Sequence, residues 1–386
     1  MRVLIAAGGT GGHIYPGITI AQTLQERRPD VDILFVGTAR GLEADLVPRA
    51  GFVFAPIPAH YLRRRVSLDV LRTVGTAFRG VMEARRIVRR FRPHVAVGTG
   101  GYVAGPVMAA ALLARVPVVL QEQNAYPGLT NRLLSRWAAL VALGQPEAAQ
   151  HLSLRARTVI TGNPIRRDVV TRTRAEGREA LGLDAQRPTL LVFGGSQGTR
   201  TINEALLEAA PDLMERLGVQ ILHQTGRAGF AAVTAAARQR WAGRGAAQPA
   251  VERGPEHVVL GRWHLVPFIH DMPAAYAAAD LVVCRAGAIT LAEITARGLP
   301  AVLVPYPYAA EGHQEANARA LAEAGAAVVV RDQELNGATL AQAVSGMLAD
   351  PHRLERMAAA SRKLGRPDAV WEIVALIEGV VALRGR

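Results

Sequence analysis

A glycine-rich loop that ends in a histidine lies close to the start of the chain. The string GGTGGH occupies positions 8–13, directly after the apolar run RVLIAA. Glycines allow the backbone to approach a ligand closely, and a helix that begins there points free N–H groups and its positive dipole end at an anion. Histidine, with an ordinary pKa of about 6.5, can accept a proton from a hydroxyl at neutral pH. The loop therefore predicts phosphate binding, with His13 as a candidate general base.

Two further glycine loops strengthen this prediction. They are GTGGYVAGP at 98–106 and GGSQG at 194–198. None of the three loops has the GK[ST] ending of a Walker motif, and the first and third do not match the dinucleotide pattern G-x-G-x-x-G. One such turn serves helix packing as often as ligand binding, but three in one chain favour phosphates. Because two of them open a domain, we expect one phosphate-bearing ligand for each domain.

A carboxylate in the second half of the chain could bind a sugar. The string CRAGAITLAEI ends a strand in a glycine turn and starts a helix that carries Glu293. Open α/β sheets bind ligands at the carboxyl ends of their strands, so Glu293 could accept hydrogen bonds from a ribose diol. The alternative is that it only compensates the helix dipole. His313, Gln314 and Asn317 could likewise bind sugar hydroxyls, or simply start a solvated helix.

Apolar runs alternate with helical stretches along almost the whole chain. The runs are RVLIAA, VDILFV, HVAVG, VPVVL and ALVAL in the first part, then TLLVF, VQILHQ, DLVVC and PAVLVP. This pattern indicates an α/β fold with parallel sheets covered on both faces. The string TGNPIRRD at 161–168 breaks helix and strand alike, and the strand–loop–helix plan restarts after it. We therefore predict two domains, residues 1–163 and 164–366, with a final helix at 367–386 that joins the first.

Composition narrows the class of protein. Cys284 is the single cysteine of the 386 residues, which excludes an internal disulfide and fits a reducing compartment. The net charge of +13 favours a polyanionic partner, although arginine-rich usage can also reflect genome composition. No stretch has the roughly 18 apolar residues of a membrane-spanning helix, so we expect a soluble or surface-bound protein. Neither a metal-ligand cluster nor a DxD-like pair is visible, so we expect neither metal nor cofactor.

The strongest basic segment covers residues 61–92. It holds ten arginines against Asp69 and Glu83. Arginines recur every seven residues, which keeps them near one helix face: Arg65, Arg72, Arg79 and Arg86. An apolar stripe runs beside them through Leu71, Val74, Phe78 and Val81. We interpret the stripe as core-facing, and the arginines as a peripheral contact with an anionic membrane surface.

Several strings together resemble the MurG-type glycosyltransferases of peptidoglycan synthesis. From Gly8 to Ala318 they are GGTGGHIYPG, GTARGLEADLV, GGYVAGP, QEQNAYPGLTNR, TGNPIR, FGGSQGTRTIN, CRAGAITLAEI and HQEANA. The resemblance implies a GT-B fold, two Rossmann-like domains whose parallel sheets face a cleft. It also implies inverting transfer of N-acetylglucosamine from UDP-GlcNAc to lipid I, which gives lipid II, at the cytoplasmic face of the cell membrane. Partner proteins of cell-wall synthesis are a further expectation.

The resemblance also implies roles for particular residues. The UDP-GlcNAc site would comprise Thr10, Gly11, Gly12, His13, Asn124, Arg166, Ser196, Ile269, Ala288, Glu293 and Gln314. Within it, Ile269 would meet the uracil, Glu293 the ribose, and Ser196 the phosphates. The acceptor diphosphate would meet Gly9, Gly12, Gly100, Gly101 and Tyr102. His13 would be the base, or would only bind that diphosphate or cap its helix.

Two departures and two rival functions accompany the resemblance. The family often has histidine where this chain has Gln121, and serine where it has Ala286, so roles of those side chains do not carry over. A UDP-GlcNAc 2-epimerase shares the fold and the donor, but GGTGGH and QEQN argue against it. A basic scaffold or nucleic-acid-binding protein is the second rival. The arginines lack interleaved aromatic residues, so we expect no nucleic acid partner.

Overall fold

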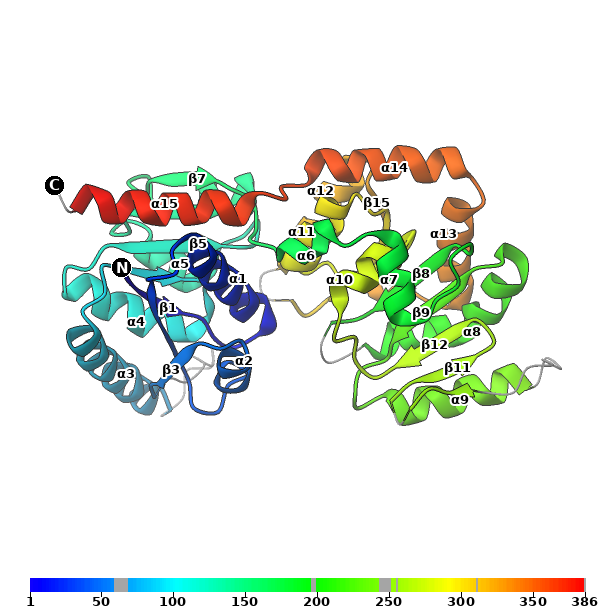
Figure 1. The fold of residues 1–386 in the computed structure, drawn as a ribbon, viewed down its shortest axis with the longest axis horizontal. Coiled ribbons are helices and arrows are strands. Elements are labelled where there is room, and N and C mark those ends of the chain that lie inside the picture. The colour runs from blue at the N-terminus through cyan, green and yellow to red at the C-terminus, as the bar shows by residue number, and fades with distance from the viewer. Residues whose placement is uncertain (59–68, 196–198, 243–250, 255, 310–311, 385–386) are drawn as a thin grey trace. The chain divides into compact units, whose positions relative to one another are not determined.

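The chain forms two compact units, each an α/β layer structure (Figure 1). The structure is a computed structural model that describes residues 1–58, 69–195, 199–242, 251–254, 256–309 and 312–384, and of residues 69–78 the backbone alone. Unit 1 comprises Met1–Ile165 and Asp368–Arg386, and unit 2 comprises Arg166–Pro367. The division after Ile165 falls two residues beyond the end of the first predicted domain at 163.

Unit 1 contains a parallel sheet of seven strands in the order β3-β2-β1-β4-β5-β6-β7. The strands are β1 (Arg2–Ala6), β2 (Asp32–Gly37), β3 (Val53–Pro56), β4 (Val95–Gly98), β5 (Val118–Glu122), β6 (Leu140–Leu143) and β7 (Thr158–Ile160). The strand order reverses between β1 and β4, which pair directly. Such a reversal separates the helices that follow the two strands and leaves a ligand site at their carboxyl ends.

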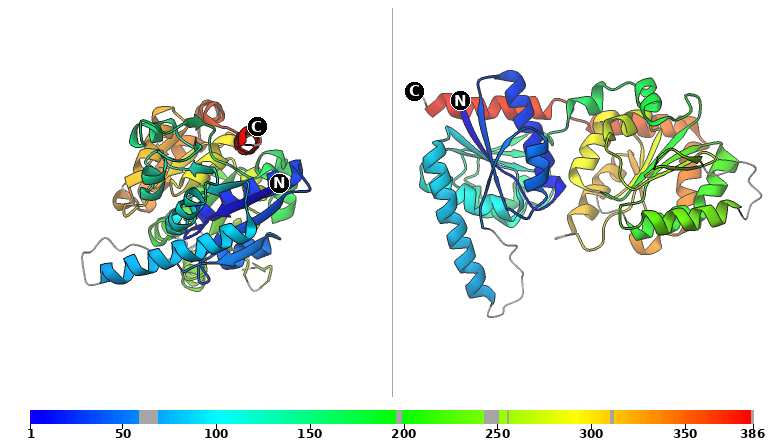
Figure 2. Two further views of the ribbon diagram at one scale, coloured as in Figure 1. Left: turned by 90° about the vertical axis from the view of Figure 1, so that its left-hand side faces the viewer. Right: turned by 60° about the horizontal axis from the view of Figure 1, so that its bottom comes forward.

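Helices cover both faces of this sheet (Figure 2). They are α1 (Gly11–Arg27), α2 (Glu43–Arg49), α3 (Asp69–Phe91), α4 (Gly101–Leu113), α5 (Leu129–Leu134), η1 (Pro146–His151) and α15 (Ala369–Arg384). Alternate residues of β1 enter different cores: Val3 packs with α1 and α15, and Leu4 with α3 and α4. The C-terminal α15 is tied to α1 by Glu378, which pairs with Arg27 at 2.8 Å and Arg28 at 2.6 Å.

Helix α3 shows which face of the basic segment is buried. Val81 and Phe91 pack against the buried cluster that contains Ala84 and Val88. The arginines of this part of α3 are exposed at positions 79, 86, 89 and 90. The core-facing part of the stripe is therefore confirmed at Val81. The predicted positions Arg65, Leu71, Arg72, Val74 and Phe78 lie outside the residues whose side chains the structure describes.

Unit 2 contains a sheet of eight strands in the order β10-β11-β12-β9-β8-β13-β14-β15. They are β8 (Thr189–Phe193), β9 (Gln220–Gln224), β10 (Val251–Glu252), β11 (Val258–Leu260), β12 (Trp263–Val266), β13 (Leu281–Cys284), β14 (Ala301–Leu303) and β15 (Ala327–Val329). Six strands are parallel, but β11 pairs antiparallel with both neighbours. This edge was not predicted; it forms because β11 and β12 are joined by a two-residue turn with Gly261 at φ +60°.

The order of strands reverses again between β8 and β13, which pair directly. The helices around this sheet are α6 (Arg167–Thr171), α7 (Arg174–Leu181), α8 (Arg200–Leu217), α9 (Phe230–Ala242), α10 (Met272–Ala278), α11 (Ala288–Arg297), α12 (His313–Glu323), η3 (Asp332–Glu334), α13 (Gly337–Leu348) and α14 (Pro351–Leu364). The loops after β8 and β13 therefore lie together at the carboxyl edge of the sheet. Within the described ranges, no helix is both long and apolar enough to cross a membrane.

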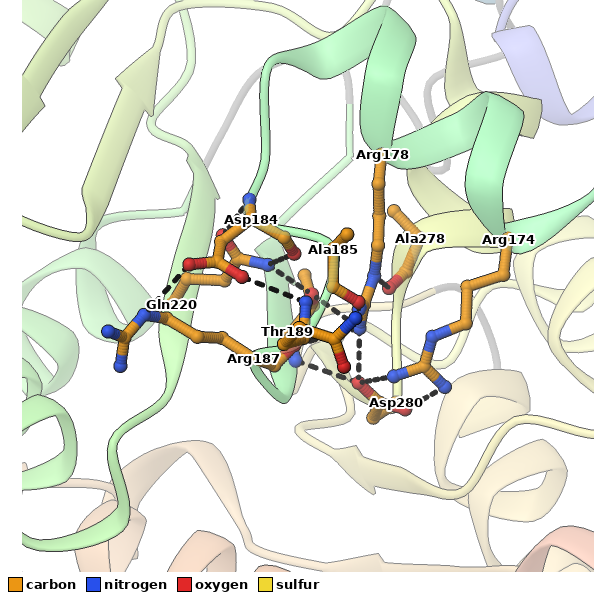
Figure 3. A network of polar contacts seen from close by, with 10 residues as sticks. Arg174, Arg178, Asp184, Ala185, Arg187, Thr189, Gln220, Ala278 and Asp280 are labelled. Carbon is orange, nitrogen blue, oxygen red and sulfur yellow. Dashed lines mark hydrogen bonds and ion pairs between the residues drawn. The ribbon is translucent and has the colours of Figure 1, made fainter.

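A network of charged and polar side chains lies at the opposite, amino-terminal edge of this sheet (Figure 3). Arg178 of α7 is 2% exposed and donates to Asp280 Oδ2 at 3.0 Å and to Thr189 Oγ1 at 3.2 Å. It also donates to the main-chain oxygens of Ala185, Arg187 and Ala278. Asp280 accepts from the Thr189 N–H at 2.8 Å as well. The network therefore ties α7 to the starts of β8 and β13.

Buried histidines make the stability of unit 2 depend on pH. Burial lowers the pKa of His223 to about 3 and, together with His257 and Arg253, the pKa of His264 to about 4. Both side chains are therefore neutral in the folded protein at pH 5, whereas the unfolded chain binds protons below about pH 6.5. We expect the free energy of unfolding to fall by about 1.4 kcal/mol per pH unit for each of them as the pH falls from 6.5.

A single substitution isolates the His223 contribution. His223 Nε2 donates to Asn203 Oδ1 at 3.0 Å, and the side-chain amide of glutamine can keep such a contact without titrating. In urea unfolding measured from pH 4.5 to 7.5, His223→Gln should show a slope shallower by about 1.4 kcal/mol per pH unit below about pH 6.5 and no difference in slope above it. The exposed His352 provides the matched control, His352→Gln. Equal slopes in His223→Gln and the parent protein would contradict the assignment.

Candidate active site

In unit 1, the loops after β1 and β4 pack against each other through glycines. Gly100 and Gly101 have φ values of +97° and +78°, which favour glycine. A Cβ atom on Gly101 would lie 2.1 Å from the main-chain oxygen of Gly8, and one on Gly100 would lie 2.8 Å from His13 Nδ1. Larger residues at either position would separate the loops. The glycines therefore bring His13 and the two loops together.

His13 lies in the first turn of α1 and is half-buried. Its Nδ1 atom lies 3.1 Å from the main-chain oxygen of Thr99 and 3.1 Å from Gln123 Oε1. The Thr99 hydroxyl donates to the main-chain oxygen of His13 at 2.8 Å. The first turn of α1 holds no acidic side chain that would compensate the helix dipole. The imidazole is thus held at one nitrogen beside a helix start suited to an anion.

A buried carboxylate supports the same loop. Glu43 is fully buried and accepts from the N–H of Thr38 at 2.9 Å, its hydroxyl at 2.7 Å, and the Gly9 N–H at 3.3 Å. The Tyr102 hydroxyl lies 3.5 Å from Thr38 Oγ1, and its ring lies against Gly9. The Gly9 N–H therefore has a partner within the protein. The sequence interpretation missed Glu43, whose neighbours ARGLEAD resemble an exposed loop.

Glu122 organises the loop that follows β5. It is 2% exposed and accepts from the Asn124 N–H at 3.0 Å and the Asn124 Nδ2 at 3.2 Å. It also accepts from the Gly128 N–H at 3.0 Å and from Asn131 Nδ2 at 2.8 Å. Asn124, predicted to contact the donor sugar, therefore has its amide nitrogen directed to Glu122. A single carboxylate therefore binds both ends of this loop.

In unit 2, Gln224 connects two segments of the predicted donor site. Its Nε2 donates to the main-chain oxygen of Gly195 at 2.8 Å, and its Oε1 accepts from the Ile269 N–H at 2.8 Å. Gly195 belongs to the glycine loop and Ile269 to the predicted uracil contact. Gln224 was not singled out from the sequence, because its contacts lie 29 and 45 residues away. Ser196, the predicted phosphate contact, lies outside the described residues.

Arg285 holds the start of α8 beside that loop. It forms an ion pair with Asp332 at 2.5 Å and donates to Thr199 Oγ1 at 2.8 Å and Thr201 Oγ1 at 3.1 Å. Both members of the pair are largely buried. Thr199 is the residue before α8, so Arg285 fixes the point where the glycine loop becomes helix.

Glu293 lies in the second turn of α11, and Tyr276 donates its hydroxyl to Glu293 Oε2 at 2.9 Å. Burial raises the pKa of Glu293 to about 7, and the Arg166 guanidinium and the Tyr276 hydrogen bond oppose this rise. Tyr276 is itself buried on α10, and its ring forms a T-shaped contact with Phe193. The carboxyl group therefore titrates near neutral pH and has a fixed orientation.

Gln314 connects the two strand ends beside α11. Its Oε1 accepts from the Ala286 N–H at 3.2 Å and the Tyr306 N–H at 2.9 Å. Asn317 donates to the main-chain oxygen of Ala286 at 3.2 Å. Since the Gln314 oxygen is used within the protein, its Nε2 is the group that can donate to a ligand. Ala288 begins α11 next to this position.

The predicted site residues thus fall into two groups, one in each unit. Unit 1 holds Gly9, Thr10, Gly11, Gly12, His13, Gly100, Gly101, Tyr102 and Asn124, and unit 2 holds Arg166, Ser196, Ile269, Ala288, Glu293 and Gln314. Most of the described residues of each group lie on loops at the carboxyl ends of the parallel strands. Among the described side chains, no group of three or more His, Cys, Asp or Glu is placed to hold a metal ion.

Two family models match the chain. Residues 3–143 match the glycosyltransferase family 28 N-terminal domain, and residues 189–373 match the glycosyltransferase family 28 C-terminal domain. Related proteins match over nearly the whole length. Those of Moorella thermoacetica and Desulforudis audaxviator are 48% and 46% identical over 98% of both chains. Each is named UDP-N-acetylglucosamine--N-acetylmuramyl-(pentapeptide) pyrophosphoryl-undecaprenol N-acetylglucosamine transferase.

Solved structures show that the fold of this chain is also similar to that of known proteins. MurG of Acinetobacter baumannii is 31% identical, with a TM-score of 0.74 over 98% of this chain and 99% of its own. A UDP-GlcNAc 2-epimerase from Neisseria meningitidis has a TM-score of 0.65 over 98% of this chain and 100% of its own, but at 14% identity it shows the fold alone. The architecture is that of the GT-B glycosyltransferases, two Rossmann-like units. The chain belongs to the MurG family of N-acetylglucosaminyltransferases, within glycosyltransferase family 28.

Proposed function

We propose that this chain transfers N-acetylglucosamine from UDP-GlcNAc to undecaprenyl-diphospho-N-acetylmuramoyl-pentapeptide, the lipid I of peptidoglycan synthesis. The product is lipid II. The observation that carries the proposal is the 48% identity, over 98% of both chains, to a transferase named for this reaction. The two groups of site residues support it, since each unit presents a glycine loop at the carboxyl end of its sheet.

Most of the groups that bind the donor belong to unit 2. The amides at the start of α8 face the diphosphate, and Glu293 accepts from the ribose hydroxyls. Because Gln224 occupies the Ile269 N–H, the Ile269 main-chain oxygen accepts from the uracil N3–H. Gln314 Nε2 donates to a sugar hydroxyl.

Transfer proceeds with inversion at the anomeric carbon. The acceptor hydroxyl attacks this carbon in line with the leaving UDP, a C–O bond forms, and the bond to the diphosphate breaks with its electron pair. His13 takes the hydroxyl proton, and the acceptor diphosphate lies at Gly12 in the start of α1 and at the loop of residues 100–102. The helix dipole and the amides at the start of α8 stabilise the charge that develops on UDP.

One incubation tests the proposal. The protein is mixed with UDP-GlcNAc and a short-chain lipid I analogue, and the products are weighed by mass spectrometry. We expect the acceptor to gain one N-acetylhexosamine and UDP to appear only when the acceptor is present. Release of UDP and a 2-epimerised sugar without any acceptor would identify an epimerase instead.

Glu293 should make the protein prefer UDP to its 2′-deoxy counterpart. Charge-assisted hydrogen bonds contribute about 1.5–3 kcal/mol each, and the deoxy ligand loses one of them. We expect Glu293→Ala to weaken UDP binding and to narrow the gap between UDP and dUDP, as measured by competition binding. Damage to the fold would weaken the binding of both nucleotides alike and keep the difference between their affinities. An unchanged preference of the variant for UDP would show that Glu293 does not bind the ribose.

In the same competition assay, UDP binding should weaken as the pH falls. Burial raises the pKa of Glu293 to about 7, so the unliganded carboxyl group becomes protonated below that pH and loses half of its acceptor capacity. UDP binding should therefore weaken as the pH falls from 8 to 6. Glu293→Gln, which cannot titrate, should lose this part of the dependence, whereas Glu355→Gln on an exposed position of α14 should keep it.

We also propose that unit 1 binds the anionic surface of the membrane that carries lipid I, on its cytoplasmic face. The exposed arginines of α3 support this: Arg79, Arg86, Arg89 and Arg90 all lie on the side opposite to the buried residues Ala84 and Val88. A basic residue near an anionic leaflet contributes about 1 kcal/mol.

Charge reversal on α3 should weaken vesicle binding. The triple variant Arg79→Glu, Arg86→Glu and Arg90→Glu should sediment with phosphatidylserine vesicles at least about tenfold less at low salt. UDP binding should be unchanged. The matched control reverses three exposed arginines of unit 2, Arg216, Arg240 and Arg356, with the same change in net charge. Equal sedimentation of the two triple variants would show that the arginines of α3 do not contact the membrane.

A further inference from the structure

A chain of buried amide side chains leads from His13 into unit 1. Gln123, Gln121 and Asn163 are 2%, 0% and 3% exposed. Gln123 Oε1 lies 3.1 Å from His13 Nδ1, Gln123 Nε2 contacts Gln121 Oε1, and Gln121 Nε2 lies 3.1 Å from Asn163 Oδ1. Buried polar atoms of this kind need a partner of the opposite type.

A main-chain carbonyl sets the orientation of the far end of this chain. Such an oxygen only accepts, so the atom that faces it must carry a proton. Asn163 lies 3.0 Å from the main-chain oxygen of Gln123 and therefore turns its Nδ2 toward it. Its Oδ1 then faces Gln121, which presents Nε2 to Asn163 and Oε1 to Gln123.

A second carbonyl sets the orientation of Gln123. The main-chain oxygen of Thr99 lies 2.7 Å from Gln123 Nε2, and Gln121 Oε1 contacts the same nitrogen. If the Gln123 amide were rotated by half a turn, its oxygen would face both of these acceptor oxygens, and no hydrogen bond could form. Gln123 Oε1 therefore faces His13, and this orientation follows from the heavy atoms alone.

His13 Nδ1 consequently faces two oxygens, Gln123 Oε1 and the Thr99 main-chain oxygen, neither of which can donate to it. The nitrogen must carry the proton of the neutral ring, which leaves the lone pair on Nε2. We infer that Gln123 is a positioning residue that holds His13 in the tautomer whose Nε2 can accept a proton. The inference deepens the proposed function, on which the role of His13 as the base rests.

The arrangement also assists the proton transfer. When Nε2 takes the proton of the acceptor hydroxyl, the ring becomes an imidazolium with a proton on each nitrogen. The charge on the Nδ1 side is then stabilised by the same two oxygens, without any rearrangement. Gln123 thus acts through His13 and touches neither substrate.

The tautomer can be observed without turnover. Long-range ¹H–¹⁵N spectra of the full chain, labelled at its 10 histidines, show which ring nitrogen is protonated. The His13 signals are assigned by their loss in His13→Ala. We expect a protonated Nδ1 and an unprotonated Nε2 at pH 8, and a protonated Nε2 would overturn the inference.

Substitution of Gln123 tests its role directly. Gln123→Met has a similar size but leaves the Thr99 main-chain oxygen as the one acceptor at Nδ1, so part of the ring should shift to the Nε2–H form. With that shift and the loss of one oxygen that stabilises the imidazolium, kcat should fall about tenfold with the KM for UDP-GlcNAc unchanged. Gln121→Met is the matched comparison, because it leaves both acceptors at Nδ1; it should keep the tautomer and lose less activity. Equal tautomer populations in the parent protein and Gln123→Met would overturn the inference.

A variant that restores the acceptor gives a second readout. Gln123→Glu puts an oxygen back at Nδ1, and its other oxygen faces the Thr99 main-chain oxygen and Gln121 Oε1, so it carries a proton on that side. Gln123→Glu should therefore keep the Nδ1–H tautomer that Gln123→Met weakens, and a ring protonated at Nε2 alone in Gln123→Glu would contradict the contact. If His13→Ala instead leaves turnover intact, the proposed base fails while the tautomer measurement stands, so the two failures are distinguishable.

Discussion

Replacing His13 with alanine should lower kcat by roughly 10²–10⁴, the usual contribution of a positioned general base. His13 is the histidine whose Nδ1 is bound by protein oxygens at the start of α1, and removal of its ring removes the proton acceptor. UDP affinity should hardly change, because Glu293, Gln224 and Ile269 belong to unit 2. Steady-state kinetics with a lipid I analogue and UDP binding by calorimetry measure the two effects separately.

Two control variants test whether the loss of kcat comes from the loss of a base at position 13. His352→Ala on the exposed face of α14 should leave kcat unchanged, which excludes a general effect of losing a histidine. His13→Asn keeps a polar side chain at the helix start and should be as slow as His13→Ala, since an amide is no base. If either His13 variant raised only the KM for the acceptor, His13 would be an acceptor-phosphate contact rather than the base.

The fold of the parallel strands was predictable because their signals are local. Val3–Ala6 and Leu190–Phe193 are continuous apolar runs that end in glycines, and these features alone indicate buried strands followed by ligand loops. The antiparallel edge was not predictable from such signals. Val258–Leu260 and Trp263–Val266 resemble the parallel strands, and their direction depends on a turn in which the Trp241 ring lies against Gly261.

In the candidate site, too, some features could be predicted from the sequence and others could not. The glycines at 100 and 101 were predictable as loop residues, because close backbone contact requires their residue type. The roles of Glu43 and Gln123 were not, since Glu43 binds Gly9 34 residues away and Gln123 binds His13 110 residues away. A charged or amide side chain carries no local signal of such a partner. Sequence patterns therefore indicated the loops that hold the site, and the structure added the side chains that orient them.

Replacing Arg178 should have the largest effect on stability. Its guanidinium bonds Asp280, Thr189 and the main-chain oxygens of three further residues at the amino-terminal edge of the unit 2 sheet (Figure 3). Arg178→Met would remove the donor that these oxygens share, although Asp280 would keep Arg174 and the Thr189 N–H. Hydrogen bonds of a charged group contribute about 1.5–3 kcal/mol each, and Arg178 makes two of them with the side chains of Asp280 and Thr189, so we expect unit 2 to lose about 3–5 kcal/mol.

Hydrogen exchange can localise this loss within one molecule. Amides of β8 and β13 should exchange about 10²–10³ times faster in Arg178→Met, whereas those of β1 and β4 in unit 1 should not change. Arg174→Met is the matched control: Arg174 pairs with the same Asp280 at 2.6 Å but is 52% exposed, so its loss should cost at most about 1 kcal/mol. Because β8 and β13 carry the glycine loop and Arg285 at their other ends, molecules that remain folded should still bind UDP normally. Equal exchange in the two variants would show that α7 is held by packing rather than by Arg178.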